Sequence, residues 1–322
     1  MKICSISAKK GKHTVIISLL LVIAIVTSTV ISTVGFAEND DYIKWVDFKI
    51  SYTVLRQAMQ IDIDTYGSNT HIDWILLLAV AACYNGGSFE EKQNDKVNDT
   101  AERIKNGENP DDIIASLKYY SYYYEAYSAV LGGFLGEYQK DGNTEYGLIA
   151  YSPVAYGYSY SHSDDFGNSR SYGFKRTHLG NDLMGSIGTP IIAVEDGIIE
   201  NMGWNKYGGW RIGIRSMDFK RYYYYAHLRK GHPYVNTLKE GMTVKAGDVI
   251  GYLGMTGYSD NEDYNGMNVP HLHFGVQLIF DESQVESNYE ICIDVYKIVK
   301  LLSHNRSHVV KNENTGDYER TA

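Results

Sequence analysis

The spacing of the apolar residues changes once along this 322-residue chain, and that change restricts the possible folds more than any other feature. From about residue 42 to 139, apolar residues recur every three or four positions, as in WVDFKISYTVLRQAMQIDI and HIDWILLLAVAAC, which predicts helices. From about 172 to 279 the period is two or the apolar runs are short, as in WRIGIRS and LHFGVQLIF. Closely spaced strands without intervening helices favour an antiparallel sheet or a sandwich. The sequence therefore predicts an α+β fold.

These patterns divide the chain into five expected segments. The first is an apolar segment with a basic tip, and it is followed by a helical domain of unassigned role, a linker rich in Gly, Ser, Asp and Asn, a β domain that ends in a helix within IDVYKIVKLLS, and a polar tail. Their expected bounds are 1–37, 38–140, 141–171, 172–302 and 303–322.

Local sequence signals add one expectation each for the helical domain and the linker. In the helical domain, Asn109 is a capping residue type and Pro110 suits the first helical position, so a helix is expected to begin there. In the linker, Asp164 and Asp165 are expected to be solvated rather than to bind a ligand.

The first segment predicts a membrane anchor. Four lysines lie within the first 12 residues, ahead of an uncharged stretch over 14–37 whose core is VIISLLLVIAIV. Twenty-odd apolar residues can span a bilayer, and the basic flank would stay in the cytoplasm. We therefore expect a single-pass protein of the cell membrane with most of its chain on the outer side. The alternative is a secreted protein, with a signal peptide cleaved near Ala37.

Composition excludes two further classes of function. The formal net charge of −9 argues against a nucleic-acid partner, because such proteins normally present a basic face. Cys4, Cys83 and Cys292 are too few and too scattered for a disulfide framework or a cysteine zinc site.

Several histidines collect in the β domain. In the segment NVPHLHFGVQ, His271 and His273 are two residues apart, so on a strand both would point to the same face. The segment THLGND holds His178 and Asp182, and YYYYAHL ends at His227. A catalytic zinc site uses three histidine or carboxylate ligands and leaves one position for water. The β domain supplies such a set, with histidines to spare for acid–base chemistry.

The motifs HLGND, YAHL and HLHF, in this order and within about 100 residues, resemble the M23 family of zinc metallopeptidases, the lysostaphin and LytM type. The segments GTPIIAVEDGIIENMGW and VKAGDVIGYLGMTG are similar to hairpins of that family, so the resemblance covers about 172–280. It implies a small antiparallel sheet that forms a groove with zinc at its floor. It implies zinc ligands at His178, Asp182 and His273, a catalytic pair at His271 and His227, and an oxyanion-stabilising tyrosine at Tyr172.

The resemblance also implies an activity, namely that of a zinc metalloendopeptidase which hydrolyses peptide bonds of bacterial peptidoglycan. In that reading His271 accepts the proton of a zinc-activated water, and His227 donates to the oxyanion of the tetrahedral intermediate. The exported topology agrees with a cell-wall substrate. Which wall bond is cut stays open, because glycine bridges and stem-peptide links are both cut within the family.

Two alternatives belong to other classes. A cupin also uses an H-x-H pair, but it needs a glutamate shortly afterwards and a histidine on a following strand; here Gln277 follows, and the next histidine, His304, lies past a predicted helix. The second alternative is a membrane-anchored, non-catalytic module for cell-wall binding or assembly, in which the helical domain docks a protein partner.

Overall fold

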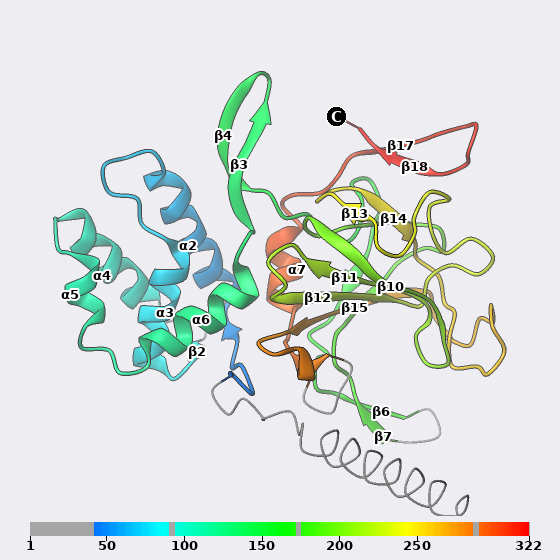
Figure 1. The fold of residues 1–322 in the computed structure, drawn as a ribbon, viewed down its shortest axis with the longest axis horizontal. Helices are drawn as coiled ribbons and strands as arrows, with labels where there is room; N and C mark the ends of the chain where they lie inside the picture. Colours follow the sequence, from blue (N-terminus) through cyan, green and yellow to red (C-terminus); the bar gives the residue numbers. More distant parts are fainter. Residues whose placement is uncertain (1–41, 90–93, 172–174, 286–289, 322) are drawn as a thin grey trace, which may run out of the picture. The chain divides into compact units, whose positions relative to one another are not determined.

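The computed structural model describes residues 42–89, 94–171, 175–285 and 290–321. Helices form the first part of this described chain (Figure 1). The predicted membrane segment over 14–37 lies outside these residues, and none of the described helices is both long and apolar enough to cross a bilayer. Two short strands, β1 (Lys49–Ile50) and β2 (Ser88–Phe89), pair in parallel beside the helices. The helices are α2 (Tyr52–Thr65), α3 (Trp74–Asn85), α4 (Asn94–Lys105), α5 (Pro110–Ile114) and α6 (Tyr120–Leu131).

Helix α3 is the buried helix that the sequence predicts. It begins where Asp73 Oδ1 accepts a hydrogen bond from the backbone N–H of Ile75 at 2.8 Å, and it ends at Gly86, which has a left-handed φ of 68°. Most of its side chains are buried, because the helix is apolar on all sides and lies inside the helical half.

The predicted start at Asn109 is confirmed, but the helical pattern does not continue to residue 139. Asn109 Oδ1 accepts from the N–H of Asp111 at 3.0 Å and caps α5, which ends after five residues. After α6 the chain forms the hairpin β3 (Leu135–Lys140) and β4 (Asn143–Leu148). The turn residues Asp141 and Gly142 have φ values of 50° and 81°, as a two-residue hairpin turn requires. This Asp-Gly turn signal outweighs the apolar spacing before it.

One antiparallel sheet dominates the second half, as the period of two predicts. Its strand order is β13-β10-β11-β12-β15-β8-β5, and β16 pairs with the far end of β15. The bounds are β5 (Ser161–His162), β8 (Asn181–Met184), β10 (Gly197–Asn205), β11 (Gly209–Ser216), β12 (Arg221–Ala226), β13 (Thr243–Val244), β15 (His271–Leu278) and β16 (Ile291–Cys292). A smaller pair, β9 (Pro190–Ile192) with β14 (Val249–Tyr252), accompanies it.

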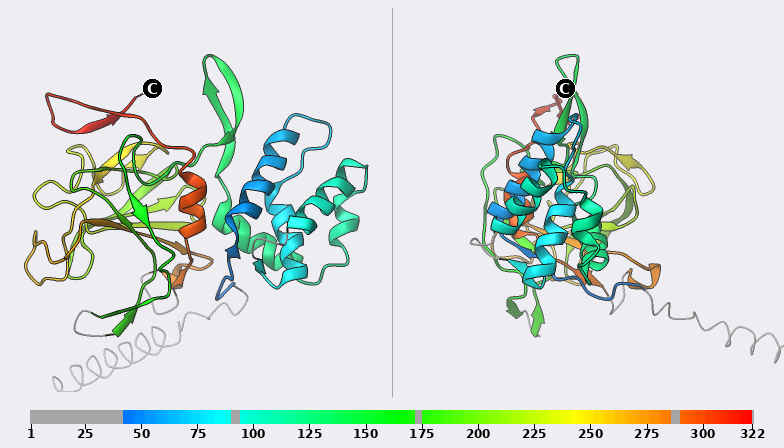
Figure 2. Two further views of the ribbon diagram at one scale, coloured as in Figure 1. Left: turned by 180° about the vertical axis from the view of Figure 1, so that it is seen from behind. Right: turned by 90° about the vertical axis from the view of Figure 1, so that its left-hand side faces the viewer.

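Strand β15 separates the core from the site. Leu272, Phe274 and Leu278 are fully buried on one face, and His273 points to the other. Helix α7 (Tyr296–Leu302) contacts α2 and lies between the helices and the sheet (Figures 1 and 2). One continuous apolar core joins both halves within the compact unit Ile43–Ala322.

A buried arginine also joins the helices to the sheet. Arg221, at the start of β12, is 2% exposed and donates from Nη1 to the carbonyl of Ala129 in α6 at 2.7 Å. Its Nη2 lies 3.1 Å from Glu195 Oε1 and 2.9 Å from Asp218 Oδ2. The last carbonyls of a helix carry partial negative charge, so a cation suits this position.

Regular structure also occurs in the predicted linker and in the predicted polar tail. Within 141–171 the structure has β4, β5 and β6 (Ser169–Ser171), the last of which pairs with β7 (Lys175–Thr177). Within 303–322 it has the hairpin β17 (Val309–Lys311) and β18 (Tyr318–Arg320). Both segments are polar because their strands lie at the surface, and surface strands carry little apolar signal.

Candidate metal and catalytic centre

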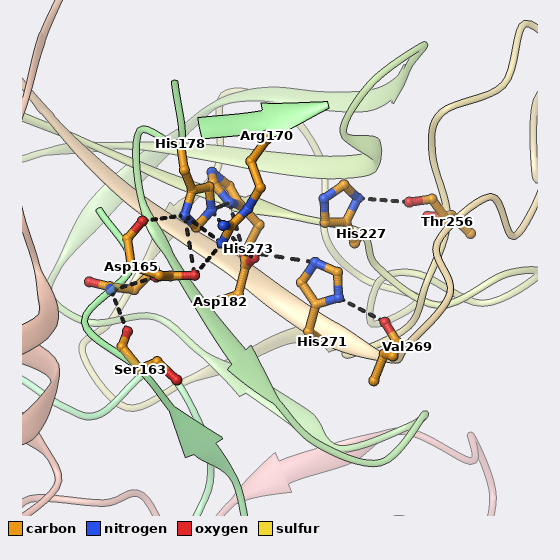
Figure 3. A network of polar contacts seen from close by, with 11 residues as sticks. Ser163, Asp165, Arg170, His178, Asp182, His227, Thr256, Val269, His271 and His273 are labelled. Atoms are coloured by element: carbon orange, nitrogen blue, oxygen red, sulfur yellow. Dashed lines mark hydrogen bonds and ion pairs between the residues drawn. The ribbon is translucent and has the colours of Figure 1, made fainter. Parts of the chain in front are cut away.

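Two neighbouring strands bring the predicted metal ligands together. His273 in β15 is paired directly opposite Asp182 in β8, and His178 lies three residues before β8 begins (Figure 3). The spacing of four between His178 and Asp182 is therefore a strand approach and not a helical turn. Opposed residues in a sheet have Cβ atoms about 4.5–5.5 Å apart, which is close enough for side chains on one face to share an ion.

The three side chains present their donor atoms to a common point. His178 Nε2 lies 2.9 Å from Asp182 Oδ1 and 2.9 Å from His273 Nδ1, and His273 Nδ1 lies 3.1 Å from Asp182 Oδ1. Tetrahedral ligands at about 2.0 Å from zinc would be separated by roughly 3.3 Å. Among the residues that the structure describes, this is the group of three whose ligand atoms are arranged for a metal ion.

Hydrogen bonds determine which nitrogen of His178 faces that point. Its Nδ1 lies 3.1 Å from the backbone carbonyl of Asp165, which can only accept, and 3.2 Å from Arg170 Nη2, which can only donate. The shorter contact, to the carbonyl, favours the tautomer with the proton on Nδ1. The Nε2 lone pair therefore faces an ionised carboxylate and a second imidazole. Three electron-rich atoms at hydrogen-bond distance repel one another unless a cation lies between them, and this chemistry fits zinc.

The pKa directions agree with a metal site. Burial alone would raise the pKa of the Asp182 carboxyl, but the neighbouring His178 and His273 outweigh it and hold that pKa well below its usual range. Burial also lowers the pKa of His273, although Asp182 opposes this. Asp182 is therefore ionised and His273 neutral near pH 7, the forms in which both bind a metal.

Sequence reasoning missed an outer layer of the site, formed by Asp165, Arg170 and Asn181. Asp165 is 8% exposed, so the expectation that it is solvated is wrong. Its Oδ1 accepts from Asn181 Nδ2 at 3.0 Å, and its Oδ2 is paired with Arg170 Nη2. Arg170 Nη2 also lies 3.4 Å from Asp182 Oδ2. Asp182 thus directs Oδ1 toward the metal position and Oδ2 toward Arg170. The Gly- and Ser-rich loop before β6 carries no periodic signal that could have indicated this layer.

The two predicted catalytic histidines lie beside the ligands. His271 Nδ1 is 2.8 Å from the carbonyl of Val269, and His227 Nδ1 is 2.8 Å from the carbonyl of Thr256 (Figure 3). Both carbonyls can only accept, so both rings carry their proton on Nδ1 and leave Nε2 free. The two ring centroids are 4.8 Å apart, and His271 Nε2 lies 3.8 Å from Asp182 Oδ1.

His227 is held in a strained backbone conformation. Its φ is 62°, a region that non-glycine residues rarely adopt and that clusters at functional sites. Burial, with His271 and His273 nearby, lowers the pKa of His227 well below the usual value, so the ring is neutral near pH 7.

The ligand His273 needs a glycine across from it. A Cβ on Gly180 would lie 2.6 Å from the Phe274 carbonyl oxygen and 2.8 Å from His273 Cε1. The glycine in HLGND therefore gives His273 its space. Tyr172, the remaining predicted site residue, lies outside the described residues.

Two cavities meet at His273. One, of about 300 Å³, is lined by both predicted catalytic histidines, the predicted ligands, Arg170 and Arg176. The other, of about 710 Å³, continues over the same sheet face past Tyr224, Gly275 and Arg211. The metal position thus has a cavity on either side of His273.

Residues 176–287 match the family model described as peptidase family M23. This segment is an M23 peptidase domain. The predicted family is confirmed for this domain, and with it the zinc cofactor on which M23 metallopeptidases depend.

Relatives and a solved structure resemble the chain over different lengths. An L-Ala–D-Glu endopeptidase of Bacillus subtilis is 34% identical over 46% of this chain and 43% of its own. The glycyl-glycine endopeptidase ALE-1 of Staphylococcus capitis is 41% identical over 30% of this chain and 24% of its own. The matched regions thus span less than half of either relative. A LytM protein from Ruminococcus gnavus superposes with a TM-score of 0.53 at 22% identity, covering 84% of this chain and 92% of its own, so the shared fold includes helices outside the M23 domain.

Proposed function

We propose that this chain is a zinc metalloendopeptidase that hydrolyses peptide bonds of bacterial peptidoglycan. The observation that carries the proposal is the completeness of the site: three ligand atoms converge, and two histidines whose Nδ1 atoms are engaged by carbonyls line the same cavity. The matching M23 model and relatives named as an L-Ala–D-Glu endopeptidase and a glycyl-glycine endopeptidase support it.

His178 Nε2, Asp182 Oδ1 and His273 Nδ1 would hold the zinc ion. When bound, zinc supplies Lewis acidity toward a peptide carbonyl and lowers the pKa of water. The two neutral imidazoles and one carboxylate leave a net charge of +1 with the ion, and Arg170 and Asp165 keep the Asp182 carboxylate directed toward it.

His271 is the proposed general base. Its Nε2 lone pair is free because Nδ1 donates to Val269, and the Asp182 carboxylate 3.8 Å away stabilises the imidazolium that forms on proton uptake.

The tautomer of His227 restricts the role that the sequence predicts for this residue. Its one N–H is used by Thr256, so it can donate to an oxyanion only after taking up a proton. The proposed oxyanion role of His227 therefore belongs to its protonated form.

A non-catalytic module is not favoured, because each described ligand and catalytic position holds the residue type that the proposed chemistry needs.

We further propose that residues 14–37 anchor the protein in the cell membrane with the enzyme on the outer side. We also propose that the helical domain docks a protein partner. The uncharged stretch and its basic flank support the anchor. Membrane retention of the full chain after a carbonate wash tests it, and release of a form beginning at Glu38 would contradict it.

The decisive experiment is a digest of purified peptidoglycan by the zinc-loaded protein, with and without a chelator. New peptide amines that vanish with chelator and return with zinc are expected, and mass spectrometry of the fragments identifies the bond. Intact wall in the presence of stoichiometric zinc would contradict the proposal. His271→Ala should retain zinc and lose turnover, whereas His178→Ala should lose both.

A further inference from the structure

One loop, residues 256–269, supplies the backbone carbonyl that each predicted catalytic histidine contacts. The carbonyl of Thr256, at its start, lies 2.8 Å from His227 Nδ1. The carbonyl of Val269, at its end, lies 2.8 Å from His271 Nδ1. A neutral imidazole carries one N–H, so the group that accepts from one nitrogen decides the tautomer of the whole ring. The position of this single loop therefore affects both rings.

The loop is compact because its backbone closes on itself. The N–H of Gly257 donates to the carbonyl of Tyr264, and the N–H of Met267 donates to the carbonyl of Met255, each at 3.1 Å. A Cβ on Gly266 would lie 2.1 Å from the Gly257 carbonyl oxygen, so the two sides of the loop are in direct contact. Close packing transmits displacements, and a shift of the middle of the loop therefore reaches its two ends.

Asp263 fastens the middle of this loop to the neighbouring sheet. Its Oδ1 accepts from the indole N–H of Trp210 in β11 at 2.8 Å and from the backbone N–H of Gly231 at 2.7 Å. Its φ of 57° lies in the left-handed region that non-glycine residues uncommonly adopt. Hydrogen bonds to a carboxylate are roughly twice as strong as those between neutral groups. The two bonds thus favour a loop conformation that the backbone alone would not.

Trp210 also contacts the start of the loop. Its backbone N–H donates to Thr256 Oγ1 at 3.1 Å, and that hydroxyl donates to the carbonyl of Leu228 at 2.6 Å. Thr256 is fully buried. One residue of β11 therefore holds the loop at two points, through Asp263 and beside the carbonyl that contacts His227.

The same loop forms part of the wall of the site. Met267, Asn268 and Val269 line the cavity of about 300 Å³ that both predicted catalytic histidines line. Asp263 does not line that cavity, so any influence on the chemistry has to pass through the loop.

We propose that Asp263 is a positioning residue: it fixes the loop 256–269 against β11, and the loop keeps His227 and His271 in the tautomer that carries the proton on Nδ1. The inference rests on the proposed endopeptidase function and adds a residue that supports the same site. When Asp263 is removed, the loop carbonyls move and the rings also populate the tautomer with the proton on Nε2. A ring in that form has no Nε2 lone pair to accept a proton from water.

The first test measures turnover of solubilised peptidoglycan by the zinc-loaded full chain. Asp263→Ala removes the acceptor of both bonds and should lower kcat by about tenfold or more with little change in KM, because reacting groups are misplaced. Asp263→Asn keeps a side-chain carbonyl oxygen and should restore most of the rate. Asp260→Ala is the matched control from the same loop. It removes only an exposed ion pair with Lys206 and should keep kcat within about twofold.

The second test measures the tautomers and needs no cleavage. Ring carbon and nitrogen chemical shifts of isotope-labelled histidine distinguish a proton on Nδ1 from one on Nε2. Wild type, Asp263→Asn and Asp260→Ala should show the Nδ1–H form at His227. Asp263→Ala should show a mixture at His227, whose carbonyl partner is distant in sequence, while zinc stays stoichiometric. An unchanged His227 tautomer in Asp263→Ala, whatever its rate, would overturn the inference.

A further variant covers the case in which Asp263→Ala does not fold. Trp210→Phe keeps an aromatic ring and removes one of the two bonds to Asp263, so it should change kcat and the His227 tautomer in the same direction but by less. Altered tautomers in a chain whose wild type cleaves no wall would keep the positioning role and reject the hydrolase. Unaltered tautomers in both variants of an active enzyme would reject the positioning role and keep the hydrolase.

Discussion

At the scale of single residues, the site depends on contacts outside the ligand set. Asp165 anchors His178 through its backbone carbonyl and orients Asp182 through Arg170. Such partners fix the tautomer and direction of a metal ligand, and their loss weakens metal binding even when all ligands remain.

Asp165→Asn should therefore lower zinc affinity by about tenfold or more. The amide weakens the pairing with Arg170, so the Asp182 carboxylate loses its fixed direction. Competition with a chromophoric chelator measures the affinity directly. Asp164→Asn is the matched control, because the neighbouring Asp164 is paired with Lys297 instead. Equal zinc affinity of Asp165→Asn and wild type would show that the outer layer does not orient the ligands.

Gly180→Ala should weaken zinc binding for a steric reason. Its Cβ would lie 2.6 Å from the Phe274 carbonyl oxygen and 2.8 Å from His273 Cε1, so the imidazole has to move. Zinc per chain after dialysis should fall below one, and activity should fall with it. Gly147→Ala is the control, since its new methyl group would meet only the Tyr138 ring at 3.5 Å. Full zinc content in Gly180→Ala would refute this account.

At the scale of secondary-structure elements, the hairpin β17–β18 is held by a carboxylate in the turn before β18. Asp317 accepts from the backbone N–H of Asn236, from the Tyr252 hydroxyl and from His232 Nε2, each at 2.9 Å. Burial opposes ionisation, but these hydrogen bonds outweigh it and lower the pKa of Asp317.

A lowered folded-state pKa predicts a pH dependence of known sign. The stabilisation from Asp317 is fully present above its unfolded pKa of about 3.9 and is lost as the pH falls through that value toward the folded pKa. Asp317→Asn should therefore be less stable than wild type at pH 6, and the difference should shrink at pH 3. Denaturant unfolding at both pH values measures it. Glu319→Gln, at an exposed position of β18, should show no such difference.

At the scale of the whole molecule, Arg221 links the helical half to the sheet. It joins α6 to Glu195 and Asp218 in a buried network. Removing one partner of a buried ion pair is costly because the other charge stays buried.

Arg221→Met should lower the free energy of unfolding by about 3–5 kcal/mol, because it leaves Glu195 buried and unpaired. Adding Glu195→Leu should restore part of the loss. Lys245→Met, which removes an exposed partner of Asp196, should change little. Chemical denaturation of the three variants measures these effects. Equal effects of Arg221→Met and Lys245→Met would show that the network does not stabilise the joined core.

The sequence by itself determined the α+β class and the cap at Asn109, and its motifs, through their family resemblance, predicted the cluster of His178, Asp182 and His273 that the structure brings together. These depend on features that are short-range along the chain: apolar period, turn chemistry and residue types in compact motifs. The hairpin at Asp141-Gly142 was also readable, but the apolar spacing before it masked the signal.

Only the tertiary structure decided which distant groups surround those motifs. From the sequence alone, Asp165 is expected to be a solvated loop residue. In the structure its backbone carbonyl contacts His178 Nδ1, because the loop that holds Asp165 lies beside the ligands that the pairing of β8 with β15 brings together. The same applies to the tautomers of His227 and His271, which depend on the carbonyls of Thr256 and Val269. Burial, tautomer and local charge arise from contacts between segments far apart in the chain, and residue order does not encode such contacts locally.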